Sequence, residues 1–221
     1  MKNRTAVCIF AHPDDEAFGP AGTIALLAQK YDLYLLCATK GEIGKDSLRN
    51  GKPLSEVRAD ELRKSAKILG IKKVFFLGFV DGTLSNSIYH KIADSIEKHL
   101  EKIKPELILT SNPNGGSGHI DHIVMSMVSS FVFERSPFIK KIMYTANTRQ
   151  MTDRQKGQPY FVYRPDGYKM EDIDEVVDVS SVWDTKLAAM AAHKSQKHDY
   201  ERILKLREGL PREEYFLVKQ K

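Results

Sequence analysis

Two short segments of the sequence concentrate side chains that bind metal ions and transfer protons. The first segment, 12–16, has the sequence HPDDE, and the second, 119–122, has the sequence HIDH. Zinc in hydrolases is held by three ligands of this kind, imidazole nitrogens and carboxylate oxygens, and the fourth position is left to water. The two segments therefore carry the chemistry of a zinc hydrolase, provided that the fold brings them together.

The first half of the chain alternates short apolar runs with longer amphipathic runs, which is typical of strand–helix units around a parallel sheet. The predicted strands are residues 5–10, 33–38, 73–77 and 106–110, and the predicted helices are 21–29, 55–69 and 87–103. Gly70 ends the second of these helices and Pro105 the third. We predict a single α/β domain over residues 1–221, with a Rossmann-like, mainly parallel sheet flanked by helices on both faces.

The alternation loosens in the second half of the chain. The pattern there predicts a helix over 120–133, a strand over 141–144, a polar stretch over 145–169 and a strand over 175–179. We interpret the polar stretch as a lid or binding loop. A final helix is predicted to start near Ser181, whose spacing from Asp184 resembles a capping box. Trp183, Leu187 and Met190 follow at the spacing of a buried helix face.

The predicted topology places the two motif segments in one crevice. In open α/β sheets, ligands bind outside the carboxyl ends of the strands, where the strand order reverses. If the first four strands take the common order 3-2-1-4, the loop after the first strand faces the loop after the fourth. His12 lies in the first of these loops, and His119 comes directly after the second.

His12, Asp15 and His122 are the predicted ligands of one zinc ion per chain. Zinc would lower the pKa of a water molecule to about 7 and would also polarise a carbonyl oxygen. Asp14, beside the ligand Asp15, is predicted to take the proton from that water as general base. Glu16 fits either a role in the site or a favourable position at the start of the next helix, and the sequence leaves both open.

Cleavage of an amide also requires a proton for the leaving nitrogen. His119 is the predicted general acid, and Asp121 is predicted to orient its ring and to favour its charged form. The sequence thus supports an amide hydrolase that uses an acid, a base and a metal.

Two alternatives remain open at this point. Clustered Asp and His residues also build two-metal phosphoesterases, in which the ions lie about 3.5–4 Å apart. A sheet crevice can also bind a nucleotide without catalysis, but the first turn lacks G-x-G-x-x-G and carries acids that repel phosphate.

Composition narrows the class of protein further. The net charge is +5, but the basic residues are spread among many acids, which indicates a solvated surface and no nucleic-acid partner. With no secretory signal and no apolar stretch long enough for a bilayer, we expect a cytoplasmic protein without a membrane partner. Cys8 and Cys37 lie in apolar strands, as reduced core cysteines do. The oligomeric state stays open, a homo-oligomer included.

The motifs AHPDDE and GHIDH resemble those of the LmbE-like or PIG-L family of zinc-dependent N-acetylglucosaminyl deacetylases. Further features match in family order: Arg58, Glu61, Leu69-Gly70, Asp81-Gly82 and the run 186–196. The resemblance implies removal of an N-acetyl group from an amino sugar or a small soluble glycoconjugate, with the same ligands, acid and base. It also implies that Arg58 and Asp81 contact the sugar.

The chain departs from the family pattern at two places. Ile120 stands where the family commonly has proline, which alters the entry to the helix and leaves the ligands in place. The loop 114–118 lacks the tyrosine that some relatives present to the oxyanion. Stabilisation of the oxyanion is therefore expected from zinc and His119.

Overall fold

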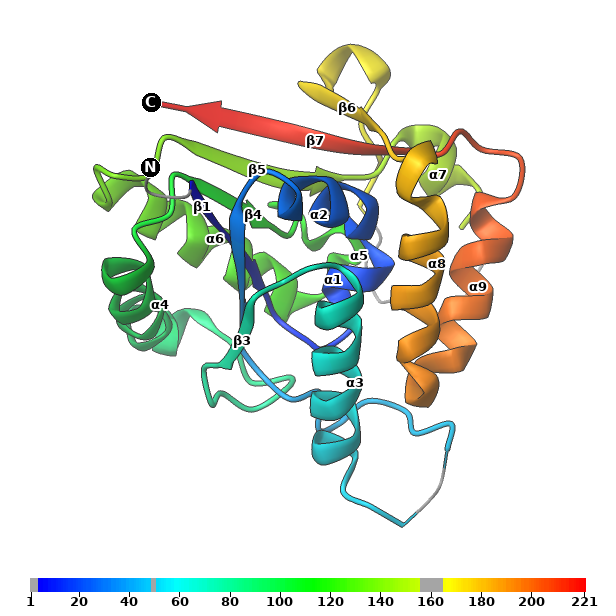
Figure 1. The fold of residues 1–221 in the computed structure, drawn as a ribbon, viewed down its shortest axis with the longest axis horizontal. Helices are drawn as coiled ribbons and strands as arrows, with labels where there is room; N and C mark the ends of the chain where they lie inside the picture. The colour runs from blue at the N-terminus through cyan, green and yellow to red at the C-terminus, as the bar shows by residue number, and fades with distance from the viewer. Residues whose placement is uncertain (1–3, 49–50, 156–164) are drawn as a thin grey trace.

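The centre of the fold is a seven-stranded sheet with the strand order β3-β2-β1-β4-β5-β7-β6. The computed structural model describes residues 4–48, 51–155 and 165–221. The strands are β1 Thr5–Phe10, β2 Asp32–Cys37, β3 Lys73–Phe76, β4 Leu107–Thr110, β5 Lys141–Ala146, β6 Glu175–Asp178 and β7 Glu213–Gln220 (Figure 1). The first five strands pair in parallel, and the predicted order 3-2-1-4 is confirmed.

Burial explains why the central strands have continuous apolar sequences. β1 lies between β2 and β4, with Ala6 paired to Leu33 on one side and to Leu107 on the other. Parallel strands covered on both faces need apolar side chains in both directions, and every residue of β4 is buried. The strand order reverses between β1 and β4, so the site expected from the sequence lies at the centre of the sheet's carboxyl edge.

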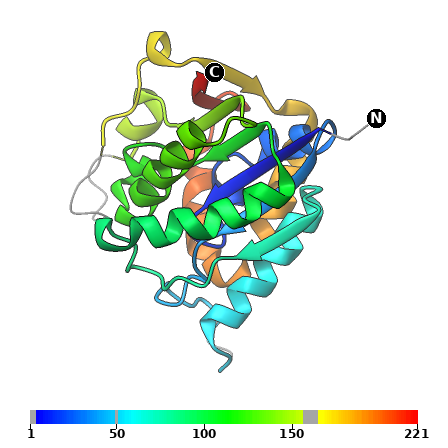
Figure 2. The same ribbon diagram turned by 90° about the vertical axis from the view of Figure 1, so that its left-hand side faces the viewer.

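Helices cover both faces of the sheet. They are α1 Asp15–Phe18, α2 Ala21–Ala28, α3 Leu54–Ile68, α4 Tyr89–Ile103, α5 Gly115–Gly118, α6 Ile120–Arg135, α7 Arg149–Asp153, α8 Trp183–Ala192 and α9 Lys197–Arg207. α2, α3 and α8 pack on one face, and α4 and α6 pack on the other, which Figure 2 shows toward the viewer. The predicted fold class, a mainly parallel α/β sheet between helices, is confirmed.

Side chains of β1 alternate between two apolar cores. Ala6, Cys8 and Phe10 face the core under α2, α3 and α8, whereas Val7 and Ile9 face the core under α4 and α6. Cys8 is buried and free, as is Cys37 of β2, and burial raises the pKa of both thiols. Gly70 follows α3 with φ +80°, a backbone conformation that glycine adopts without steric cost.

One prediction for the C-terminal part is wrong, and a second holds at two of its three residues. The residues 180–182 form a 3-10 turn, so α8 begins at Trp183 after Val182, and no side chain caps it. Ser181 is therefore not the N-cap. Leu187 is only partly buried, and Lys186 takes a fully buried position on α8 instead. Met190 is fully buried and Trp183 packs against the same core, so the expected buried face is confirmed at these two positions.

The strand β7 has no counterpart in the sequence-based prediction. It lies between β5 and β6 and is antiparallel to both. Within the described ranges, no helix combines the length and the hydrophobicity that crossing a bilayer requires. The stretch predicted as a lid or binding loop, 145–169, is described only in part, because 156–164 lie outside the described residues.

Candidate active site

The two motif segments meet at the carboxyl edge of the sheet. His12 comes two residues after β1, and His122 lies in the first turn of α6, which follows the loop after β4. The Nδ1 atom of His12 lies 3.1 Å from the Nε2 atom of His122. The structure therefore brings together the segments that the predicted strand order placed in one crevice.

The predicted metal ligands converge with the spacing of a tetrahedral site. Asp15 Oδ1 lies 3.1 Å from His122 Nε2, and Asp15 Oδ2 lies 3.9 Å from His12 Nδ1. At zinc–ligand distances of about 2.0–2.2 Å, two ligands of one tetrahedral ion lie roughly 3.3–3.6 Å apart. The residues present therefore fit a zinc ion held by these three side chains.

Hydrogen-bond partners determine which nitrogen of each ligand carries a proton. His122 Nδ1 lies 3.1 Å from the carbonyl oxygen of Gly115, which only accepts, so this nitrogen donates. His12 Nε2 faces two carboxylates, Asp81 at 2.9 Å and Asp121 at 3.2 Å, so this nitrogen also donates. When both rings are neutral, each presents a lone pair at the short His12–His122 contact. Lone pairs this close to each other and to a carboxylate repel, and either a proton or a metal cation among them removes this repulsion.

The charges of the site also favour a cation among these side chains. Burial lowers the pKa of His12, but hydrogen bonds to Asp121 and Asp81 and the charge of Asp15 outweigh this and raise it to about 10. Burial also lowers the pKa of His122, yet the carboxylate of Asp15 leaves it above its ordinary value. Burial would raise the pKa of Asp15, but the His122 and His12 imidazoles hold it well below its usual range. The cluster therefore favours positive charge between its carboxylates.

The carboxylate of Asp121 is held from the loop after β3 and contacts His12. It accepts hydrogen bonds from the backbone N–H groups of Gly82 at 2.8 Å and Leu84 at 3.2 Å. Among the contacts of the described residues, the Asp121 carboxylate makes no hydrogen bond to His119, whose ring the sequence analysis expected it to orient. The structure places this carboxylate behind a predicted metal ligand, where such groups fix the ring of the ligand.

Two other groups of side chains could also hold a cation. His12 and His122 form one of them with His119, and the other, on the opposite side of the His12 ring, consists of His12, Asp81 and Asp121, all buried. Both oxygens of Asp121 already accept backbone hydrogen bonds, and Asp121 does not line the pocket described below. The position at His12 Nδ1 opens on that pocket, and it is therefore the better candidate for a metal that meets a substrate.

Asp14, the predicted general base, lies in the pocket with a constrained backbone. Its φ angle of 115° is uncommon for a residue with a side chain. Arg58 Nη2 donates to Asp14 Oδ2 at 2.9 Å and to the carbonyl oxygen of Pro13 at 2.6 Å, while Nη1 donates to the carbonyl oxygen of Gly41. Burial raises the pKa of Asp14 to about 6, although the positive charge of Arg58 opposes this. A carboxyl group with such a pKa accepts protons near neutral pH.

His119, the predicted general acid, is the N-cap of α6. Its Nδ1 atom accepts the backbone N–H of Asp121 at 3.2 Å, so the proton of the neutral ring lies on Nε2. Burial and the neighbouring rings of His122 and His12 lower its pKa. A protonated His119 is therefore a stronger acid than an ordinary histidine.

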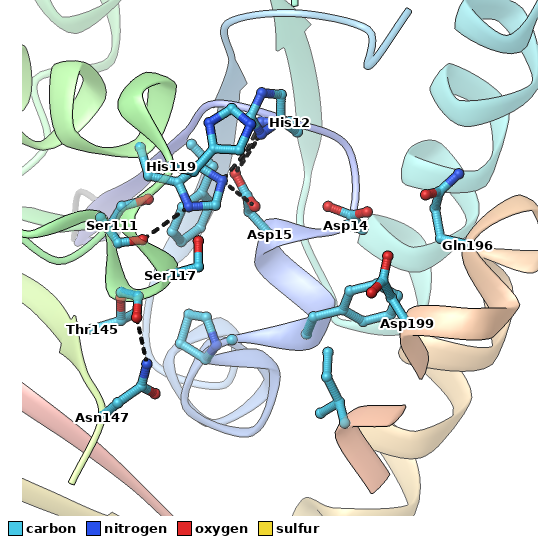
Figure 3. Close-up of a pocket in the computed structure, with 18 of the residues that line it drawn as sticks. His12, Asp14, Asp15, Ser111, Ser117, His119, Thr145, Asn147, Gln196 and Asp199 are labelled. Carbon is cyan, nitrogen blue, oxygen red and sulfur yellow. Dashed lines mark hydrogen bonds and ion pairs between the residues drawn. The ribbon is translucent and has the colours of Figure 1, made fainter. Parts of the chain in front are cut away.

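A cavity of about 570 Å³ extends from this cluster. Figure 3 shows His12, Asp15 and His119 on one side of it and Gln196 and Asp199 on the other. The predicted ligands, acid and base all line it, as do Arg58 and Asp81. A volume of this size suits a small organic ligand.

Sequence reasoning missed the part of the cavity wall that α9 forms, which includes Ile203 and Leu206. Met151 of α7 also lines the cavity, and it lies in the stretch 145–169 that was interpreted as a lid or binding loop. The spacing of Ile203 and Leu206 on one helix face was a local signal, but only packing shows that this face borders the site. Gly115, Gly116 and Ser117 of α5 line the opposite wall.

Comparison with known proteins identifies the family. The model of the PIG-L family, described as GlcNAc-PI de-N-acetylase, matches residues 7–132, which include both motif segments and more than half of the chain. The chain belongs to the PIG-L family. A relative from Bacillus cereus, named as a probable N-acetyl-alpha-D-glucosaminyl L-malate deacetylase 2, is 32% identical over 87% of this chain and 84% of its own length.

Solved structures show the same fold. N,N'-diacetylchitobiose deacetylase from Pyrococcus horikoshii has a TM-score of 0.73 and 25% identity, over 99% of this chain and 85% of that one. A 4-carboxy-2-hydroxymuconate hydratase from Pseudomonas putida reaches a TM-score of 0.71 at 18% identity, covering 99% of this chain and 97% of its own. Because a hydratase shares this architecture, the fold alone does not determine the reaction, and the residues of the site must.

Proposed function

We propose that this PIG-L family member is a zinc-dependent N-deacetylase that removes the acetyl group from an N-acetyl amino sugar or a small conjugate of one. The observation that carries the proposal is the convergence of His12 Nδ1, His122 Nε2 and Asp15 Oδ1, three electron-pair donors, on one point of the cavity. The names of the relatives support the amide as the bond that is cleaved.

His12, Asp15 and His122 would hold the zinc ion. Two imidazoles and a carboxylate are a common ligand set of zinc hydrolases, and they suit zinc better than magnesium or calcium, which prefer oxygen. When bound, zinc lowers the pKa of water to about 7 and polarises a carbonyl group. Asp81 and Asp121 keep the proton of His12 on Nε2 and thereby leave Nδ1 free to bind.

Asp14 and His119 divide the proton transfers. Asp14 takes a proton from the attacking water as its oxygen bonds to the acetyl carbon. The carbon–nitrogen bond then breaks as a protonated His119 gives a ring proton to the departing nitrogen and becomes neutral, so that acetic acid and a free amine result. The proton held by Asp14 then passes to solvent, and His119 takes up another. The lowered pKa of His119 favours this second transfer. Arg58 holds the Asp14 carboxylate toward the cavity.

The substrate class follows from the size of the cavity and from the relatives. The relatives are named for N-acetylglucosaminyl malate and for diacetylchitobiose, both small conjugates of an N-acetylated sugar. The wall formed by α9, which includes Ile203 and Leu206, would receive the part of the substrate beyond the acetylated ring. A phosphoester is a poorer fit, because the carboxylates of Asp14, Asp15 and Asp81 line the cavity beside the reacting position and repel phosphate.

The test is release of free amine from N-acetylglucosamine, its malate conjugate and diacetylchitobiose by purified protein. Activity should disappear on chelation and return with one equivalent of zinc. Asp14→Asn should keep zinc and lose about 100- to 10,000-fold in kcat, the range for removal of a general base.

His122→Ala is the matched variant for the metal. It should lose zinc in elemental analysis, whereas Asp14→Asn should not. Full zinc content in His122→Ala would remove this residue from the ligand set. Activity on p-nitrophenyl phosphate with none on any acetylated sugar would replace the deacetylase by the phosphoesterase.

A further inference from the structure

A fully buried ion pair lies directly behind the cavity. Glu16 Oε1 accepts from His193 Nε2 at 2.7 Å and from the hydroxyl of Ser65 at 2.5 Å, and the side chains of Glu16 and His193 have no exposed surface. Burial lowers the pKa of His193, but the charge of Glu16 outweighs this and leaves it above its ordinary value. The proposed reaction gives this pair no role.

The other oxygen of Glu16 reaches the backbone of Asp14. Glu16 Oε2 accepts the N–H of Asp14 at 3.1 Å. The carbonyl oxygen of Asp14 accepts from Ala17 at 2.9 Å and from Phe18 at 2.8 Å at the start of α1. Since Asp14 has φ 115°, its peptide groups must be held on both sides for this conformation to persist. Glu16 holds the N-terminal side.

The metal ligand next in sequence is held separately. Asp15 Oδ2 accepts the backbone N–H groups of Ala11 at 3.1 Å and His12 at 2.9 Å. Neither of these bonds involves Glu16 or His193. A change in the buried pair can therefore displace Asp14 while the Asp15 carboxylate keeps its position.

We infer that Glu16 and His193 are positioning residues that hold the strained backbone of Asp14 so that its carboxylate faces the reacting water. This inference rests on the proposed role of Asp14 as general base. His193 supplies the hydrogen bond at 2.7 Å that keeps the Glu16 carboxylate buried and directed at the Asp14 N–H group, because a buried carboxylate without a partner would turn toward water. Glu16, which the sequence placed either in the site or at a helix start, acts through Asp14.

The chain contains a matched control for this pair. Ser195, two residues after His193, donates its backbone N–H to Glu61 Oε1 at 2.8 Å and its hydroxyl to Glu61 Oε2 at 2.6 Å. This second pair is also buried and joins α3 to the segment after α8, whereas Glu16 and His193 join α1 to the end of α8; neither Ser195 nor Glu61 contacts Asp14. Ser195 Oγ also accepts from Gln196 Nε2 at 3.1 Å, so Ser195→Ala reports what loss of buried polar contacts away from Asp14 does.

The experiment compares Glu16→Gln, His193→Gln and Ser195→Ala as zinc-loaded full-length proteins. A glutamine at position 16 has one acceptor oxygen for the three groups that now donate to Glu16: Asp14 N–H, Ser65 O–H and His193 N–H. Glu16→Gln and His193→Gln should each lower kcat about 10- to 100-fold, the effect of a misplaced catalytic group, with KM within about twofold and zinc content unchanged. Ser195→Ala should keep kcat within about twofold at a similar loss of melting temperature.

A double variant tests whether the pair acts as a unit. Glu16→Gln with His193→Gln should lose about as much kcat as either single variant, instead of the product of the two losses. If either single variant unfolds, the other and this double variant still provide the comparison.

The outcomes separate the inference from the proposed function. Glu16 and His193 variants that match Ser195→Ala in kcat at equal zinc content would overturn the positioning role. If Asp14→Asn is inactive in the same assays, the deacetylase proposal stands without the positioning role of Glu16 and His193. If Asp14→Asn is fully active, the base assignment fails first, and the positioning role falls with it.

Discussion

The role of Asp121 provides a direct test of the structural argument, because sequence and structure assign it different partners. The sequence analysis placed its carboxylate behind the general acid His119. In the structure the carboxylate lies 3.2 Å from His12 Nε2 and accepts the backbone N–H groups of Gly82 and Leu84. Asp121→Asn should therefore weaken zinc binding and stability as well as activity.

The magnitudes follow from the number of acceptor oxygens. Asparagine offers one oxygen where aspartate offers two, so either Gly82 or Leu84 loses the acceptor of its N–H group. An unsatisfied buried N–H group costs about 1–3 kcal/mol of the free energy of unfolding. Loss of the charge behind a histidine ligand weakens metal binding by about 10- to 100-fold, which corresponds to roughly 1.4–2.7 kcal/mol.

Competition with a chromogenic chelator measures the zinc Kd, and urea denaturation of the metal-free protein measures the free energy of unfolding. Asp81→Asn is the matched variant, since Asp81 bonds the same His12 nitrogen at 2.9 Å but does not hold Gly82 or Leu84. It should weaken zinc binding with a smaller loss of stability. Wild-type zinc affinity and stability in Asp121→Asn, combined with a lower kcat, would show that the carboxylate acts through His119 and would refute the argument.

Three further predictions concern other parts of the structure. Burial raises the pKa of Asp14 to about 6, and a bound cation can only lower it, so kcat/KM should fall tenfold per pH unit below an apparent pKa no higher than about 6. The charge of Arg58 lowers this pKa. In Arg58→Gln, the fall of kcat/KM at acid pH should therefore begin at a higher pH than in the wild type. Lys186→Met leaves the buried Glu214 carboxylate without its cation at 2.5 Å, so it should lower the free energy of unfolding by about 3–5 kcal/mol in denaturant titration. Adding Glu214→Gln to this variant should restore part of the loss. Gly41→Ala should lower the free energy of unfolding by more than the roughly 1–2 kcal/mol expected for alanine at φ +68°, because the new Cβ would lie 2.1 Å from Arg58 Nη1. A melting curve like that of the wild type would contradict the packing around Arg58.

Much of the fold was predictable because its signals are local. The continuous apolar runs of β1, β2 and β4 have the composition that strands covered on both faces require. The end of α3 was marked by Gly70. The convergence of His12 and His122 was also predictable, since the usual strand order places the ends of β1 and β4 side by side.

The C-terminal part shows where local signals fail. β7 contains aromatic and branched residues, but its place between β5 and β6 depends on which open edge it meets after α9. The start of α8 was predicted from Ser181 because a serine followed by an acid suits a cap, yet the 3-10 turn at 180–182 delays the helix. Tertiary packing overrides such preferences when the difference in local energy is small.

The sequence by itself determined the main sheet, the site at its carboxyl edge and the donor types gathered there, because periodicity, chain punctuation and ligand chemistry are properties of neighbouring residues. Only the tertiary structure decided which atoms meet. It aligned His122 through the carbonyl of Gly115, set Asp121 behind His12, and paired Glu16 with His193, 177 residues away. The partner of a buried charge is chosen by the packing of distant elements, and no local pattern of residues encodes that choice.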